Sequence, residues 1–277
     1  MRKPQYGGLE LVQISFNVFP NGRKKALTMS YDDGEIYDHR LVEIFNRNGI
    51  KGTFHLNSGN LDTEGYIKSK EVAALYKGHE VASHGKHHLD LRTLPRNIVI
   101  QEIQEDRRAL ESLVGYPIRG FSYPFGNYND ELVNVLSALG IEYSRTVNTT
   151  RGFFVNPDFL RWQATCHHDE HLLEIAKRFI DDKHYWSYGL MYVWGHSFEF
   201  EKNKNWGLIE EFCKMVGGRD DVWYATNIEI ADYINAVKGL RFSVDRTVVF
   251  NPSAKDVWIG VKDETVKIPS GKCVRLA

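Results

Sequence analysis

Three short polar clusters contain the residue types that bind metals and transfer protons. They are Asp32-Asp33-Gly34, the segment from His84 to His88, and His196. An Asp-Asp-Gly sequence by itself predicts a turn, and a single histidine by itself predicts a structural residue. The combination is more informative, because carboxylates and imidazoles are the ligands that zinc takes in catalytic sites.

The histidine-rich segment could supply two ligands to one cation. His84 and His88 are four residues apart and lie on one face if the segment turns helically. Asp33 could add a carboxylate, because the adjacent Asp32 would stay free to act as a base beside a metal-bound water. We therefore expect one divalent metal, zinc first, at Asp33, His84 and His88. Cobalt, nickel and manganese remain open, since nitrogen and oxygen ligands bind all of them.

The elements that must position these clusters alternate between short apolar strands and amphipathic helices. We expect strands at 25–31, 50–56, 80–83, 118–123, 141–146 and 190–194, and helices at 38–48, 71–77, 95–114, 130–139, 171–181 and 226–237. This alternation predicts parallel strands joined by right-handed crossovers. Each polar cluster then lies at the carboxyl end of a strand, where barrel enzymes place their catalytic loops.

The alternation stops after Val237. Beyond it the sequence is typical of short strands separated by turns. We predict two parts, a barrel over residues 1–238 and a small β appendage over residues 239–277.

Composition narrows the class of protein. The 277 residues suffice for one large α/β domain, and 35 basic against 36 acidic residues give a net charge of −1. We therefore expect no nucleic-acid partner, and no apolar run is long enough to predict a membrane span. Cys166, Cys213 and Cys273 are far apart, which fits buried thiols in a cytoplasmic protein, although secretion stays open. The sequence does not predict an oligomeric state.

Four segments resemble the motifs of the polysaccharide deacetylase family, carbohydrate esterase family four. Ser30 to Gly34 resembles the Thr-Phe-Asp-Asp-Gly motif, and Ser83 to Leu91 resembles Ser-His-x-x-x-His-x-Asp-Leu. Phe121 to Gly126 is similar to the third motif, Arg-Pro-Pro-Tyr-Gly, and Trp194 to His196 stands where the family has Leu-x-His. The order of the four segments along the chain also agrees.

The resemblance implies a distorted (β/α) barrel of about seven parallel strands. It implies a hydrolase that removes N-acetyl or O-acetyl groups from a carbohydrate with metal-activated water. Asp33, His84 and His88 would hold the metal, Asp32 would be the general base and His196 the general acid. The backbone N–H of Phe125 would bind the oxyanion.

Further pocket residues are expected beside the motifs. Trp194 would form a wall of a slot for the acetyl methyl group, and Tyr123 would line the same pocket. Ser122 occupies the place where the family has an arginine against the catalytic aspartate. Arg119 would point to the opposite face of its strand, so we expect Arg161 to replace that arginine.

Two other functions are weighed against deacetylation. Some relatives with this barrel open cyclic amides or imides, often without the full metal set, and the intact Asp33, His84 and His88 disfavour that activity. A carbohydrate-binding protein that has lost catalysis would fit the missing arginine, but both aspartates and His196 disfavour it. We interpret His55 as a hydrogen-bonded barrel residue. His167 and His168 are expected at the surface, with a supporting role near His196 left open.

Overall fold

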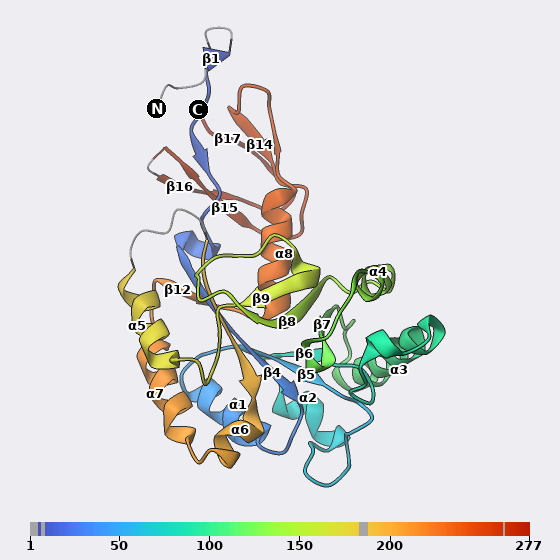
Figure 1. Cartoon of the computed structure of the whole chain (residues 1–277). Helices are drawn as coiled ribbons and strands as arrows, with labels where there is room; N and C mark the ends of the chain where they lie inside the picture. Colours follow the sequence, from blue (N-terminus) through green and yellow to red (C-terminus); the bar gives the residue numbers. More distant parts are fainter. Residues whose placement is uncertain (1–4, 7–8, 183–187, 263) are drawn as a thin grey trace.

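The computed structural model describes residues 5–6, 9–182, 188–262 and 264–277. A barrel of strands surrounded by helices forms the larger part, and β-strands stand against one end of it (Figure 1). Among the described residues, none of the helices has the length and apolar character that crossing a membrane requires.

A nearly closed barrel of parallel strands forms the centre of the molecule. The strands pair in the order β4 (Lys25–Asp33), β5 (Gly52–Leu56), β6 (Glu80–Ser83), β7 (Gly120–Ser122), β8 (Tyr143–Thr149) and β9 (Trp162–Ala164). Only Thr165 separates β9 from β10 (Cys166–His167), which pairs with β11 (Gly189–His196), and β11 pairs along its length with β4. With β9 and β10 counted as one interrupted strand, the strands named here form a barrel of seven strands. This arrangement confirms the predicted distorted barrel.

Strand β4 shows how the sequence builds two faces of the barrel wall. Successive side chains point to opposite faces of a strand. Leu27, Met29 and Tyr31 face outward into an apolar cluster with the surrounding helices. Ser30 and Asp32 face inward, where both contact His55 of β5. The alternation therefore delivers a carboxylate to the interior at the end of the strand.

Eight helices cover the barrel and its amino end within the described residues. They are α1 (Asp38–Arg47), α2 (Val72–Leu75), α3 (Arg96–Val114), α4 (Asp130–Ala138), α5 (Leu172–Asp181), α6 (Ser197–Lys202), α7 (Trp206–Val216) and α8 (Asn227–Lys238). Sequence patterns did not predict α6, α7, or the short strand β12 (Val222–Tyr224), which pairs with the start of β4.

Helix α8 closes the amino end of the barrel. Thr226 and Glu229 form a capping box, each side chain accepting the other's backbone N–H. Asn227 reaches into the barrel, where it accepts a hydrogen bond from Thr28 Oγ1 at 2.8 Å and donates one to the Tyr192 hydroxyl at 2.6 Å. Apolar side chains further along α8 complete the seal.

The last part of the chain forms two small antiparallel sheets. One contains β13 (Arg241–Phe242), β14 (Val248–Phe250) and β17 (Cys273–Arg275); the other contains β16 (Glu264–Ile268), β15 (Val257–Val261) and β3 (Ile14–Ser15). A further hairpin joins β1 (Gln5–Tyr6) and β2 (Leu9–Glu10). The second sheet thus includes a strand from the beginning of the chain. Cys273 is exposed here, unlike the buried Cys166 and Cys213 and contrary to expectation.

Candidate active site

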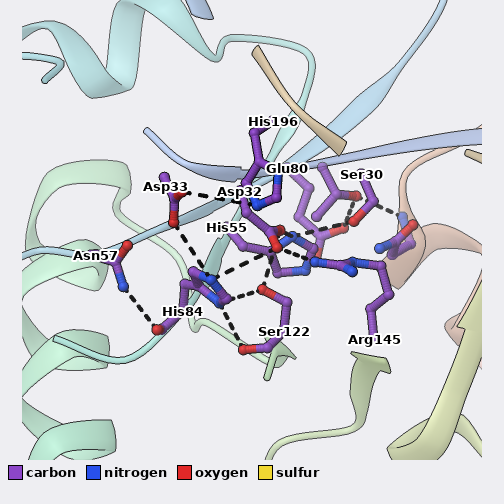
Figure 2. A network of polar contacts seen from close by, with 12 residues as sticks. Ser30, Asp32, Asp33, His55, Asn57, Glu80, His84, Ser122, Arg145 and His196 are labelled. Atoms are coloured by element: carbon purple, nitrogen blue, oxygen red, sulfur yellow. Dashed lines mark hydrogen bonds and ion pairs between the residues drawn. The ribbon is translucent and has the colours of Figure 1, made fainter. Parts of the chain in front are cut away.

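The carboxyl end of the barrel gathers the polar residues that the sequence singled out (Figure 2). Asp32 and Asp33 end strand β4, so alternation should send their side chains to opposite faces. Asp33 instead has a φ of +80°, in the left-handed region that residues with a Cβ avoid. That turn allows both carboxylates to approach the same imidazole, since His84 Nε2 lies 3.7 Å from Asp32 Oδ2 and 3.6 Å from Asp33 Oδ1.

Asp33, His84 and His88 form a group that fits a divalent cation. Asp33 Oδ1 lies 3.6 Å from His84 Nε2 and 3.8 Å from His88 Nε2. The Nδ1 of His84 lies 2.8 Å from the carbonyl oxygen of Ser122, to which it can donate, leaving the lone pair of Nε2 free for a metal. Burial lowers the pKa of His84 to about 3, which keeps the ring neutral. The donor set and its preset orientation therefore suit zinc.

The backbone that carries the two histidines is fixed by buried polar side chains. Asn57 Nδ2 donates hydrogen bonds to the carbonyl oxygens of His84 and Gly85, at 2.8 and 2.7 Å. His88 adopts a positive φ of +52°. His87 faces away from the group, because its Nδ1 lies 2.7 Å from Glu102 Oε1. The loop thus presents His84 and His88 together and turns His87 aside.

Asp32 is buried in a network of donors inside the barrel (Figure 2). His55 Nδ1 and Ser122 Oγ each lie 3.2 Å from its Oδ1, and the Arg145 guanidinium pairs with Oδ2. Burial opposes ionisation of Asp32, but Arg145, His84 and His55 together hold its pKa well below the usual range. Asp32 is therefore an ionised carboxylate.

Arg145, and not Arg161, takes the place of the missing arginine. Arg161 lies outside the barrel, where its guanidinium bonds Asp158 at 2.9 Å and Asp130 at 2.6 Å. The expectation for Arg161 was wrong because its segment turns away before β9 begins. The sequence did contain a signal for Arg145. Tyr143 and Arg145 are two residues apart on one predicted strand, so their side chains share a face. A basic residue on an inward face needs a buried acid.

Of the expected pocket residues, Phe125 and Trp194 lie beside the site and Tyr123 does not. Tyr123 is buried outside the barrel, where its hydroxyl donates to the Leu160 carbonyl at 2.8 Å, so its expected place in the pocket was wrong. The strand explains this result, since Tyr123 follows the inward-facing Ser122 and takes the opposite face. Phe125 is 60% exposed, with its ring 4.4 Å from that of His88. Trp194 lies beside His196, at a ring distance of 5.9 Å.

His196 ends β11 between two carboxylates. Its Nε2 lies 3.9 Å from Asp33 Oδ2, and its Nδ1 lies 3.3 Å from Glu199 Oε2. Burial lowers the pKa of His196, but Glu199, Asp32 and Asp33 outweigh it and raise the pKa above the ordinary value. Sequence reasoning missed Glu199, although an acidic residue in the first turn of a helix that follows a candidate acid is a usable signal.

His167 and His168 are not the surface residues that the sequence suggested. His168 is fully buried, with its ring stacked 4.2 Å from Phe200, and His167 is largely buried beside Trp194 at 4.6 Å. His167 ends β10 and His168 follows it, and because β10 pairs with β11, the carboxyl ends of the two strands bring both residues to His196. Their Nε2 atoms lie 3.1 and 3.2 Å from Glu199 Oε2.

Comparison with known proteins agrees with this arrangement. Residues 20–144 match the family model described as polysaccharide deacetylase. A probable peptidoglycan-N-acetylglucosamine deacetylase of Arthroderma benhamiae is 29% identical over 118 residues, which is 42% of this chain and 27% of that protein. A chitin deacetylase of a Pestalotiopsis species is 28% identical over 116 residues, 42% of this chain and 39% of that protein. The matched regions span less than half of either relative.

Solved structures share the barrel. A protein of Mycobacterium smegmatis assigned as a polysaccharide deacetylase superposes with a TM-score of 0.61 at 18% identity, over 82% of this chain and 96% of that one. A mutant of a CE4 family pseudoenzyme from Bacillus anthracis, with restored activity, superposes with a TM-score of 0.51 at 18% identity, over 78% and 70% of the two chains. The fold is thus a (β/α) barrel with a polar carboxyl end. The match to the polysaccharide deacetylase model over residues 20–144 agrees with the resemblance seen in the motifs.

Proposed function

We propose that this protein is a metal-dependent hydrolase that removes N-acetyl or O-acetyl groups from a carbohydrate. One observation carries the proposal: Asp32, Asp33, His84, His88 and His196 converge at the carboxyl end of one barrel, in contact or near contact with one another. The similarity of residues 20–144 to the polysaccharide deacetylase family model supports the substrate class.

Asp33, His84 and His88 are the residues that would hold the cation. A divalent metal there, with zinc as our first candidate, would polarise the acetyl carbonyl and make a water molecule easier to deprotonate. The neutral state of His84 supports this role, because an imidazole binds a metal through a free lone pair.

The reaction then needs a base, an acid and a donor to the oxyanion. Asp32 would take a proton from the attacking water as its oxygen bonds to the acetyl carbon. The backbone N–H of Phe125 would donate to the carbonyl oxygen as negative charge develops on it. His196 would protonate the nitrogen or oxygen of the sugar as its bond to the acetyl carbon breaks, releasing acetate. Trp194 would border the site of the methyl group.

The charges of this chain support that division of labour. Arg145 keeps Asp32 ionised, whereas the carboxylates around His196 favour its protonated form. A base that is ionised and an acid that is protonated at the same pH give a bell-shaped profile of kcat/KM.

The test is acetate release from a panel of acetylated oligosaccharides, measured together with bound metal. His88→Ala should lose metal and activity together. Asp32→Asn and His196→Ala should each keep the metal and lower kcat by roughly 10²-fold or more. His87→Ala is the matched control, because that imidazole faces Glu102, and it should keep metal and most turnover. Near-normal turnover in Asp32→Asn would refute the mechanism.

A further inference from the structure

A second group of possible metal ligands lies on the far side of His196 from Asp33. It contains His167 at the end of β10, the next residue His168, His196 at the end of β11, and Glu199 in the first turn of α6. Glu199 Oε2 lies 3.1 Å from His167 Nε2, 3.2 Å from His168 Nε2 and 3.3 Å from His196 Nδ1. One carboxylate oxygen thus faces three imidazole nitrogens. The mechanism above uses neither His167 nor His168.

The spacing of three of these groups suits a cation with tetrahedral coordination. Ligand atoms of His167, His196 and Glu199 all lie within 4.8 Å of one another. Zinc bonds of about 2.0–2.1 Å in a tetrahedron separate ligand atoms by roughly 3.3–3.4 Å. The two contacts to Glu199 already have nearly this length. The three side chains retain 14 to 23% exposure, so a hydrated ion can reach them from solvent.

Unsatisfied ring nitrogens provide an independent observation. Within the described part of the chain, both ring nitrogens of His168 and the Nδ1 of His196 are buried without a partner in hydrogen-bond geometry. His168 Nε2 and His196 Nδ1 lie 3.2 and 3.3 Å from Glu199 Oε2, but neither contact has the geometry of a hydrogen bond. Leaving a buried polar atom unpaired is unfavourable, whereas a cation can accept the lone pair of Nδ1.

We propose that His167, His196 and Glu199 form a second, weaker zinc site whose occupation inhibits the enzyme. The inhibitory part rests on the function proposed above, in which His196 is the general acid. Zinc on Nδ1 displaces one proton of the imidazolium to solvent and leaves only the proton on Nε2. His196 then lacks the extra proton that the departing nitrogen or oxygen requires.

His167 must change its tautomer to bind. Its Nδ1 now accepts a hydrogen bond from the Asp169 backbone N–H at 3.2 Å, so its proton sits on Nε2 and faces Glu199. Coordination through Nε2 moves this proton to Nδ1 and breaks one exposed hydrogen bond, which costs free energy. This cost contributes to making the second site weaker than the first.

Equilibrium dialysis with zinc alone tests the site without reference to activity. Starting from protein loaded with one equivalent, the wild type should take up a second equivalent, and His167→Gln and Glu199→Gln should not. Asp33→Ala, which lacks the first site, should still bind one equivalent. His39→Gln is the matched control, because this imidazole is exposed on α1 and outside both groups, and it should bind two.

Acetate release measured over the same zinc range tests inhibition. In the wild type, turnover should fall at least tenfold as the second equivalent binds, whereas His167→Gln should keep most of its own turnover in excess zinc. Failure of the wild type to bind a second equivalent, or equal binding by His167→Gln, would overturn the site. A protein inactive on all acetylated sugars would refute the proposed function, while the dialysis would still decide whether the second site exists.

Discussion

At the carboxyl end of the barrel the chain holds a carboxylate, a guanidinium and several imidazoles away from water. At the amino end α8 instead closes the barrel with the hydrogen-bonded, uncharged Asn227 and with apolar side chains further along the helix. Asp32 and Arg145 are at most 3% exposed at the first end. Ile230 and Ile234 of α8 pack at the second end with the large ring of Trp162.

The carboxyl end also contains strained backbone. Asp33, His88 and Phe125 adopt positive φ at the carboxyl end, although each has a Cβ. Helix α8 begins with a complete capping box at the amino end. The comparison of the two ends indicates that the strained backbone of the site is maintained by stabilising interactions elsewhere in the barrel.

The largest expected effect is at the buried ion pair. Arg145→Met leaves Asp32 buried without its main partner, which should cost roughly 3–5 kcal/mol of unfolding free energy and suppress kcat by protonating the base. Arg161→Met is the matched control, because its acidic partners are solvent-exposed, and it should cost under about 1 kcal/mol. Urea unfolding with activity assays measures both. Equal losses in the two variants would contradict the distinction between a buried pair and a surface pair.

The amino end should respond in stability alone. Ile230 is fully buried in the cluster that seals the barrel, so Ile230→Ala should cost about 2–5 kcal/mol by leaving a cavity. The kcat/KM per folded molecule should stay unchanged, because the site is at the opposite end. A tenfold loss of kcat/KM in the fully folded Ile230→Ala variant would show that packing at the amino end affects the site at the carboxyl end.

Glu80 should make stability depend on pH. Burial raises its pKa from 4.5 to about 7, while Ile228 N–H, Tyr143 and Thr53 hydrogen-bond the carboxyl group. Because the folded pKa is the higher one, the contribution of Glu80 to stability is fully present below pH 4.5 and is lost as pH rises towards 7, by on the order of 2–3 kcal/mol.

Glu80→Gln keeps the shape and the hydrogen-bonding capacity and should remove this part of the pH dependence. Urea unfolding of both proteins at pH 4.5, 6 and 7.5 isolates the effect, since all other titrating groups are shared. Parallel stability curves across this range would show that Glu80 ionises as readily in the folded protein as in the unfolded one.

The smallest effect compares glycine with alanine at the two ends. Phe125 has a φ of +58°, so Phe125→Gly should be more stable than Phe125→Ala by about 1 kcal/mol. Ala236 lies inside α8, where Ala236→Gly should instead cost about 1 kcal/mol. Thermal unfolding of the three variants gives both signs. The same sign at both positions would remove the case for strain at the site.

Much of the barrel could be predicted from the sequence, because alternation of strand and helix patterns is a local property. The capping box at Thr226 and the apolar strand that ends at His196 are examples. Strands β9 and β10 were missed because Thr165 interrupts them, leaving pieces too short to show a period. The pairing of β3 with β15 joins residues almost a whole chain apart, which local patterns do not report.

The candidate site likewise could be predicted where it depends on local sequence and not where it depends on long-range contacts. Motif residues at strand ends could be located from spacing, and the structure brings Asp33, His84 and His88 together. Arg145 and Glu199 were missed because their roles depend on which neighbours reach them across the barrel. Tyr123 was misplaced because adjacency to a motif was given more weight than the alternation of its strand.

The pairing of β3 with β15 has a consequence for the order in which the protein assembles during synthesis. Ile14 and Ser15 are made early, yet their partners are Val261 and Gly260. Strand β3 therefore has no partner until nearly all of the chain has been synthesised, whereas β4 and β5 can pair soon after they are made. The barrel can form first and the small sheet last, so a ribosome stalled late would release a chain with an open strand edge, the kind of surface that promotes aggregation.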